Sequence, residues 1–163
     1  MLWDEGRVYW EPGSIITNSS FIGIVTGEQL VHSQLAQLTI RNSSFTEISG
    51  THDEGTIVRA TEGTLILQNS TFTSNVAGEG GSIHLSSRSH MDAMNMTFTD
   101  NSARKRGGSL VAIEESKFSL TNSSFTGNQA AIGSAIYGEN MYETTFNLTG
   151  VNFTSNSATQ ALI

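Results

Sequence analysis

Apolar and polar residues alternate along this chain in short runs, and the runs recur at nearly constant spacing. In one such stretch Leu65 and Leu67 precede Phe72, and a glycine pair precedes Ile83. Apolar positions two residues apart have the period of a β-strand. Leu67 and Phe72 are an odd number of residues apart, so in one continuous strand they would face opposite sides. If both point inward, the chain bends between two short strands. The apolar residue after the glycines predicts a third.

One phenylalanine marks each repeat. Successive marker phenylalanines are separated by 24, 27, 26, 27 and 28 residues. They are Phe21, Phe45, Phe72, Phe98, Phe125 and Phe153. The third strand of the repeat is expected at 55–57, 81–83, 108–110 and 134–136. A fixed period in this range is typical of a solenoid, in which each repeat is buried by its neighbours.

Three short strands per repeat predict an all-β fold, a right-handed parallel β-helix of about six coils. Residues 14–163 are expected to form the coils, and residues 1–13 an N-terminal cap or lateral strand. Like positions of neighbouring coils then lie ~4.8 Å apart, the spacing of hydrogen-bonded strands. The marker phenylalanines are therefore expected to stack inside as a buried ladder, beside a second apolar ladder that includes Leu67, Leu120 and Leu148.

An asparagine follows the marker phenylalanine by three residues in the last four repeats. These residues are Asn75, Asn101, Asn128 and Asn156. Their place before the glycines predicts a turn, where stacked amides can bond one another and the turn backbone. A polar ladder is therefore expected beside the phenylalanines.

Seven of the twelve asparagines begin an Asn-x-Ser/Thr sequence, the acceptor motif for N-linked glycans. They are Asn18, Asn42, Asn69, Asn95, Asn122, Asn147 and Asn152. The first five lie three residues before a marker phenylalanine, so they are expected to form one row along the solenoid. We predict that N-linked glycans occupy this row. The alternative is a second amide ladder that carries no sugar, because asparagine at a bend also bonds local backbone.

Composition points to a neutral, hydroxyl-rich surface. Only 14% of residues are charged, and the net charge is −7. A negative chain is a poor partner for nucleic acid or anionic membranes. No apolar stretch is long enough for a membrane span. Together with the glycosylation motifs, this predicts an extracellular or cell-surface protein.

No catalytic residue, cofactor or metal site is predicted. The acidic residues scatter over different repeat positions, and the four histidines lack the spacing of metal ligands. The basic run 104–106 is interpreted as a solvated turn. The glycine clusters lack the lysine and helix of a phosphate-binding loop.

Two short motifs carry a resemblance. Phe-x-x-Asn occurs as FTSN, FTDN, FTGN and FTSN, starting at Phe72, Phe98, Phe125 and Phe153, and Gly-Gly-Ser-Ile/Leu occurs at 80–83 and 107–110. Over residues 14–163 the chain resembles the passenger domains of chlamydial polymorphic outer membrane proteins and, more broadly, right-handed parallel β-helices of the pectate-lyase type. The resemblance implies a β-helix and a role in surface adhesion.

The two ends suggest self-association. Residues 156–163 contain no proline and no charge, and they finish with Ala161, Leu162 and Ile163. An uncapped coil exposes strand edges and apolar side chains. The aromatic segment from Trp3 to Trp10 either seals the first coil or reaches a neighbouring molecule. We therefore expect a non-enzymatic structural protein that forms a head-to-tail filament with itself as partner.

Alternatives remain for the function. The chain could be part of a longer stalk that serves as an adhesin or carbohydrate-binding module. Hydroxyls on both sides of each marker phenylalanine, such as Thr71 and Thr73, are also typical of β-helical ice-binding proteins. A polysaccharide-degrading enzyme is the remaining alternative.

Overall fold

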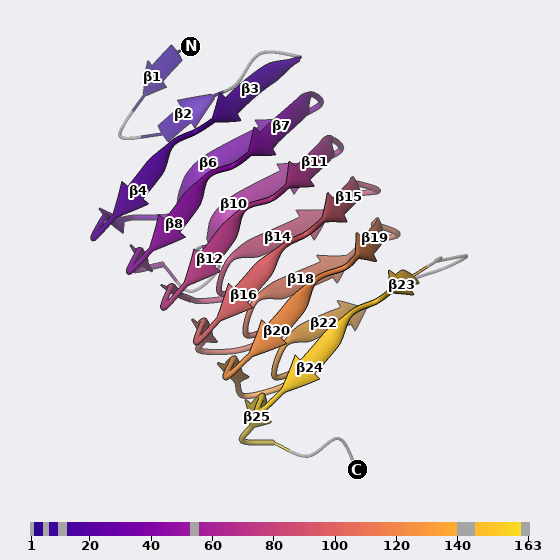
Figure 1. Cartoon of the computed structure of the whole chain (residues 1–163). Coiled ribbons are helices and arrows are strands. Elements are labelled where there is room, and N and C mark those ends of the chain that lie inside the picture. The colour runs from indigo at the N-terminus through magenta and orange to yellow at the C-terminus, as the bar shows by residue number, and fades with distance from the viewer. Residues whose placement is uncertain (1, 5–6, 10–12, 53–55, 140–145, 161–163) are drawn as a thin grey trace.

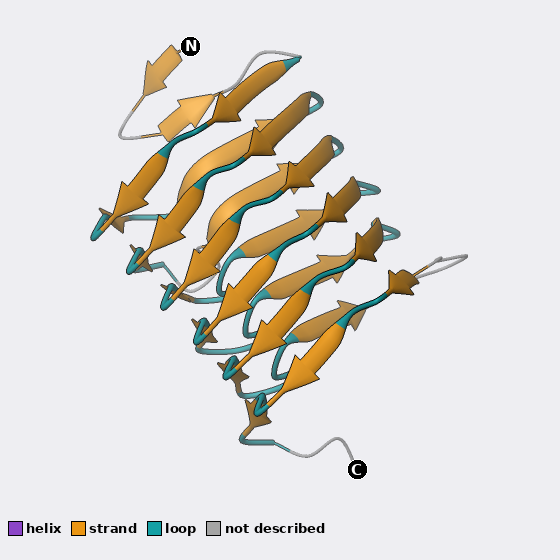
Figure 2. Ribbon diagram, in the orientation of Figure 1, coloured by secondary structure: helices purple, strands orange, loops and turns teal. Residues whose placement is uncertain are grey.

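The computed structural model describes residues 2–4, 7–9, 13–52, 56–139 and 146–160. Every regular element in this part of the chain is a β-strand (Figure 2). Among the described residues there is no helix long and apolar enough to cross a membrane. The strands form one sheet of seven strands, here sheet A, and three sheets of six strands, B to D. The predicted all-β class is confirmed.

The strands are short, and each sheet takes about one strand from each coil. Sheet A contains β1 (Leu2–Asp4), β2 (Arg7–Tyr9), β6 (Gln29–Gln34), β10 (Thr56–Thr61), β14 (Ile83–Ser86), β18 (Leu110–Ile113) and β22 (Ile136–Glu139). Sheet B contains β3 (Ser14–Thr17), β7 (Gln37–Arg41), β11 (Thr64–Gln68), β15 (His90–Met94), β19 (Lys117–Thr121) and β23 (Phe146–Thr149). Sheet C contains β4 (Ser20–Ile22), β8 (Ser44–Thr46), β12 (Thr71–Thr73), β16 (Thr97–Thr99), β20 (Ser124–Thr126) and β24 (Asn152–Thr154). Sheet D contains β5 (Val25–Thr26), β9 (Ser49–Gly50), β13 (Val76–Ala77), β17 (Ser102–Ala103), β21 (Gln129–Ala130) and β25 (Ser157–Ala158).

The chain winds as a right-handed solenoid. Each coil passes through sheets B, C, D and A in that order and then enters the next coil. In Figure 1 the chain crosses the near face from upper right to lower left, returns across the far face and descends from coil to coil. This is the hand that parallel crossover connections almost always adopt. The predicted right-handed parallel β-helix of about six coils is confirmed.

Two details differ from the prediction. Each coil has four strands rather than three, because the chain pairs again for two residues in sheet D after the asparagine turn. The third predicted strand also begins later, at Ile83 and Leu110, and the glycines before it form a turn. A side chain at Gly81 would collide with the carbonyl oxygen of Gly108. These glycines are therefore needed for close stacking of successive turns rather than for a strand.

The residues before the first coil add to sheet A. Strands β1 and β2 form an antiparallel hairpin, and β2 pairs in parallel with β6. Trp10 lies outside the described residues. Strands β3, β4 and β5 are the first strands of sheets B, C and D, and in the described part of the chain each pairs on one side only.

The marker phenylalanines stack along the centre of the solenoid. Neighbouring rings from Phe21 to Phe153 have centroids 4.6–5.5 Å apart and are within 12° of parallel. Each inner member is fully buried: Phe45, Phe72, Phe98 and Phe125. Sheet B contributes two further buried apolar rows, which are Leu38, Leu65, Met91 and Phe118, and Ile16, Ile40, Leu67, Ala93 and Leu120. Burial of each large side chain contributes roughly 1.5–3 kcal/mol.

A ladder of buried amides runs beside the phenylalanines, at the turn between sheets C and D. The Oδ1 atom of Asn101 accepts two hydrogen bonds from Asn75, one from its backbone N–H at 3.1 Å and one from its Nδ2 at 3.0 Å. The second hydrogen of Asn75 Nδ2 is donated to the Phe45 carbonyl at 3.0 Å. The same pattern joins Asn101 to Asn128 and Asn128 to Asn156. The ladder therefore satisfies turn backbone that no strand pairs.

The ladder begins at the third coil. Ile24 and Ile48 occupy the corresponding positions of the first two coils. The backbone N–H of Ile48 donates to Asn75 Oδ1 at 3.0 Å. The side chain of Ile48, by contrast, offers no acceptor to the first coil.

Replacing Phe98 by alanine tests the phenylalanine ladder. Because Phe98 is fully buried between Phe72 and Phe125, we expect Phe98→Ala to lower the free energy of unfolding by about 3–5 kcal/mol. Urea titration monitored by circular dichroism would measure this change in the free energy of unfolding. Thr126→Ala, at an exposed position of β20, is the control and should change it by less than about 0.5 kcal/mol. Equal effects of the two substitutions would show that the ladder is not the core.

Candidate functional site

The five asparagines of the predicted glycan row occupy one repeated turn between sheets B and C. All five are exposed and have a left-handed backbone, with φ of 51° at Asn18, 49° at Asn42, 49° at Asn69, 55° at Asn95 and 48° at Asn122. Asparagine and glycine adopt this conformation at lower cost than most residues, although Glu47 and Ser74 also adopt it at another turn of the repeat. In the sixth coil the position is taken by Gly150, with φ of 63°. The backbone therefore favours asparagine or glycine here, with or without a sugar.

The side chains of this row form an external amide ladder. Nδ2 of Asn42 donates to Oδ1 of Asn18 at 3.3 Å, Asn69 donates to Asn42 at 3.2 Å, and Asn95 donates to Asn69 at 2.9 Å. Unlike the buried ladder, this one is open to solvent along its length. Both interpretations of the row in the sequence therefore remain compatible with its geometry. An N-glycan replaces only one of the two hydrogens on Nδ2.

The residues after each row asparagine point alternately inward and outward. The middle residue of the motif is inward: Ser43 Oγ accepts from the Ser19 backbone N–H at 3.2 Å, and Ser70 Oγ accepts from that of Ser43 at 3.1 Å. The next hydroxyl lies on the outer side, where Ser44 Oγ donates to Ser20 Oγ at 3.0 Å. The motif thus serves the fold through its first two residues, and its third lies at the surface.

Two motif asparagines lie outside the row. Asn147 is an exposed residue of β23, and Asn152 is an exposed residue of β24. Asn152 pairs with Ser124 and so occupies the place of the outer hydroxyl in earlier coils. The outer hydroxyls on both sides of the marker phenylalanines are in register from coil to coil, for example Thr71 with Thr97 and Thr73 with Thr99. Sheet C therefore presents two parallel hydroxyl rows.

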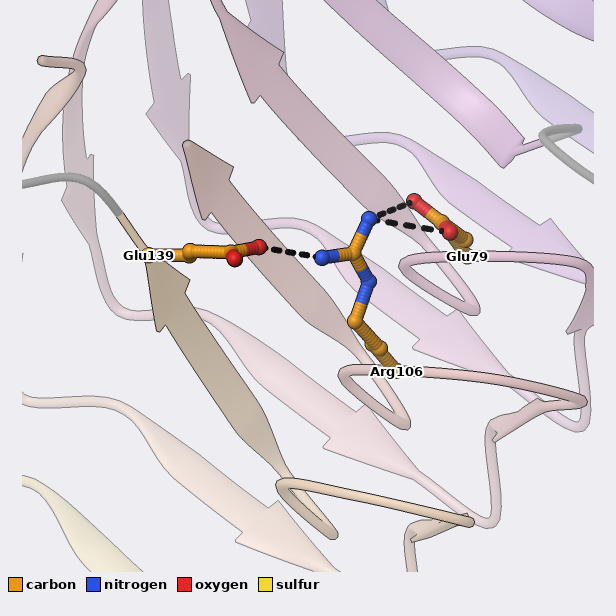
Figure 3. Close-up of polar contacts among 3 residues, drawn as sticks. All are labelled: Glu79, Arg106 and Glu139. Atoms are coloured by element: carbon orange, nitrogen blue, oxygen red, sulfur yellow. Dashed lines mark hydrogen bonds and ion pairs between the residues drawn. The ribbon is translucent and has the colours of Figure 1, made fainter. Parts of the chain in front are cut away.

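On the other side of the solenoid, Arg106 ties three consecutive coils together (Figure 3). Its Nη2 donates to both carboxylate oxygens of Glu79 at 3.0 Å, and its Nη1 donates to Glu139. The guanidinium carbon also lies 5.0 Å from the centre of the Tyr137 ring. The Glu79 side chain is only 8% exposed. Both carboxylates are thus engaged by one cation, an arrangement suited to holding turns in place.

The interpretation of residues 104–106 as a solvated turn holds only in part, because Arg104 and Lys105 are exposed in a bend but both arginines bond other parts of the chain. Arg106 forms the cluster just described, and Arg104 Nη2 donates to the backbone carbonyls of Gly50, Thr51 and His52 at 3.2, 3.1 and 2.8 Å. The sequence does contain a signal for the Glu79–Arg106 pair, because each residue immediately precedes a glycine pair of the repeat. Comparing like positions of neighbouring repeats would have found this pair.

Three of the acidic residues of the sequence lie outside the described residues: Asp53, Glu54 and Glu143.

His84 is buried on β14 near this cluster. It is 2% exposed, and neither ring nitrogen has a hydrogen-bond partner within the described residues. Burial, with smaller contributions from the positive charges of Arg59 and Arg106, lowers the pKa of His84 to about 3. His84 is therefore neutral at neutral pH.

The last coil leaves its apolar side chains half uncovered. Phe146, Leu148 and Phe153 are 50%, 46% and 49% exposed. The preceding members of the same rows, Phe118, Leu120 and Phe125, are at most 2% exposed. At the first coil Ile16 is only 4% exposed. The two ends of the described solenoid are therefore unequal, and residues 161–163 lie outside the described part.

Comparison of this chain with protein-family models, with curated proteins and with solved structures gave no match. Function is therefore inferred from three features of the molecule itself. These are the asparagine row on the outer surface, the cluster around Arg106 and the half-uncovered last coil.

The lowered pKa of His84 predicts a loss of stability in mild acid. In the unfolded chain histidine titrates near 6.5, so between pH 6.5 and about 3 the unfolded state binds more protons than the folded state. The contribution of neutral His84 to the free energy of unfolding is fully present above pH 6.5. It falls by about 1.4 kcal/mol for each pH unit below that value. Between pH 6.5 and 5 we expect a loss of about 2 kcal/mol, measured by urea unfolding.

His84→Leu should remove this part of the pH dependence. Thr126→Ala, at an exposed position of β20, changes no titratable group; it is the control and should keep the pH dependence of stability of the unchanged protein. If the free energy of unfolding of His84→Leu depends on pH as steeply as that of the unchanged protein, His84 is not a buried neutral group.

Proposed function

We propose that the protein is a non-enzymatic structural rod of the extracellular space or cell surface. In this proposal glycans line one face, and the solenoid is prolonged end to end at its last coil. The observation that carries the proposal is the exposure of Phe146, Leu148 and Phe153, whose counterparts in the preceding coil are buried. Apolar side chains at half exposure, next to strands with a free edge, favour another layer of strands.

The strands of the last coil present their edges together with these side chains. Among the described strands, β23, β24 and β25 are the last members of sheets B, C and D, and β22 is the last of sheet A. A coil added in register would continue all four sheets and cover the three apolar side chains. The repeat itself is therefore the template for extension.

A second copy is one partner for this surface. In a head-to-tail joint its Phe21, which is only partly buried, would stack on Phe153, as like positions do within the chain. Such a contact does not close on itself and propagates as a filament. The alternative is a longer stalk, in which another solenoid segment covers the last coil and the outer faces serve an adhesin or carbohydrate-binding module. The resemblance of the repeats to passenger domains of chlamydial polymorphic outer membrane proteins supports a surface role in either arrangement.

The asparagine row supports the extracellular part of the proposal. All seven motif asparagines are exposed, so their Nδ2 atoms can carry sugars without unfolding the solenoid. Row positions lie one strand spacing apart, ~4.8 Å, and branched glycans at that spacing crowd one another. We therefore expect partial occupancy along the row rather than a sugar on every asparagine.

Peptide mapping of native material, before and after enzymatic deglycosylation, tests the glycan row. We expect sugar on some of Asn18, Asn42, Asn69, Asn95 and Asn122. Asn69→Gly should lose the glycan at that position and still fold, because glycine adopts the left-handed turn, as Gly150 does. Finding all five asparagines unmodified would leave the sugar-free ladder as the explanation of the row.

Light scattering and electron microscopy of the 163-residue chain test head-to-tail assembly. We expect the apparent mass to rise with concentration and elongated particles to form. Leu148→Lys should prevent this by placing a charge on the joint, whereas Thr154→Lys, at an exposed position of β24, should have little effect. A dispersed monomer at high concentration would rule out the filament.

A further inference from the structure

The buried amide ladder specifies what kind of coil can cover the last one. At each complete step, the backbone N–H and Nδ2 of one asparagine both donate to Oδ1 of the next. The distances are 3.1 and 3.0 Å from Asn75 to Asn101, 3.0 and 3.1 Å from Asn101 to Asn128, and 2.9 and 2.9 Å from Asn128 to Asn156. The ladder therefore has a direction, in which the amide oxygen that accepts from each asparagine belongs to the following coil.

Asn156 is the last member, and it makes three of the five hydrogen bonds that a complete member of the ladder makes. Its Oδ1 accepts from Asn128, and its Nδ2 donates one hydrogen to the Phe125 carbonyl at 2.9 Å. Within the described residues, its backbone N–H and its second Nδ2 hydrogen have no acceptor. Both would be buried by any coil that covers Phe153, because Asn75, Asn101 and Asn128 are all fully buried. A covering coil without an acceptor there would leave two buried donors unpaired, which costs free energy.

The first coil of a second copy fits this requirement poorly. Its residue at the ladder position is Ile24, whose side chain cannot accept a hydrogen bond. Its Ile16 is already 4% exposed, so little apolar surface remains to be gained there. On sheet A, β1 lies along the edge of β2 that β22 of another copy would need. In a joint of two unmodified copies Phe21 can stack on Phe153, but the amide ladder is not continued, so the proposed head-to-tail contact is weaker than one with an asparagine-bearing coil.

We propose that the last coil is a binding surface for a β-solenoid coil that carries an asparagine three residues after its inward phenylalanine. This inference rests on the proposed prolongation at the last coil and adds its specificity. The apolar side chains Phe146, Leu148 and Phe153 give affinity for any coil of this shape. The two donors of Asn156 select a coil with an amide oxygen at the matching position, and they favour the in-register alignment in which, as at the earlier steps, one oxygen accepts from both.

The test uses two fusions that differ at one residue. A copy of residues 107–132, which contains β18 to β21 and Asn128, is joined after residue 160 so that it continues the last coil. The second fusion has isoleucine in place of the copied asparagine, which reproduces the side chain at position 24. Hydrogen exchange at the backbone amides of Phe153 and Asn156 is measured in both fusions and in the unmodified chain.

We expect both fusions to slow exchange at Phe153, and the asparagine fusion to slow exchange at Asn156 about tenfold more than the isoleucine fusion, as the loss of a buried hydrogen bond implies. Equal protection of Asn156 in two fusions that both protect Phe153 would overturn the specificity but leave the prolongation intact. If neither fusion protects Phe153, both the prolongation and this inference fail.

Ile24→Asn in the whole chain gives an independent readout. It supplies the missing acceptor to a second copy, so self-association measured by light scattering should be about tenfold tighter than in the unmodified chain. Ile22→Asn, at an exposed position of β4 outside the ladder, is the matched control. Equal association of the two variants would contradict a selective role for the ladder.

Discussion

The spacing of hydrogen-bonded parallel strands governs every other feature of this protein. It places each side chain ~4.8 Å from the side chain at the same position of the next coil, so each residue must pack against, or bond to, the residues at the same position of the neighbouring coils. Phenylalanine does so with rings 4.6–5.5 Å apart and nearly parallel. Asparagine does so through amide hydrogen bonds, both in the core and on the surface. Repetition in the sequence is thus a physical requirement of the winding.

The same requirement explains what could be predicted. A period of 24–28 residues and the two-residue spacing of Leu65 and Leu67 were sufficient to predict a parallel β-helix of about six coils. The two-residue strands of sheet D were missed because Val76 and Ala77 are too few to show a period. The start of the third strand was misplaced because Gly81 was interpreted as strand, whereas it permits contact between turns. The Glu79–Arg106 pair was missed because charges were compared along the chain rather than between like positions of neighbouring repeats.

Positions at which the repeat changes residue type are the ones that distinguish the ends and faces of the molecule. Ile24 and Ile48 stand where later coils have asparagine, so the first coils lack the amide ladder that the last coil leaves unfinished. Gly150 replaces asparagine in the external row, which shows that the turn there requires a left-handed backbone. Arg106 between Glu79 and Glu139 replaces stacking of like residues by attraction of opposite charges across three coils. The proposed glycan row from Asn18 to Asn122 lies along the side of the solenoid, whereas the proposed extension uses the last coil, which carries Asn147 and Asn152.

Side-chain amides that bond from each coil to the next complete the backbone hydrogen bonding that the strands leave open. Native-state hydrogen exchange of the unmodified chain, resolved residue by residue, tests it most directly. The backbone N–H of Asn101 donates to Asn128 Oδ1 at 3.0 Å in a fully buried turn, so its exchange should require an opening as large as that of the neighbouring core strands. The backbone N–H of Asn156 has no such acceptor within the described residues and should exchange at least about a hundredfold faster. Equal exchange rates at Asn101 and Asn156 would contradict the account.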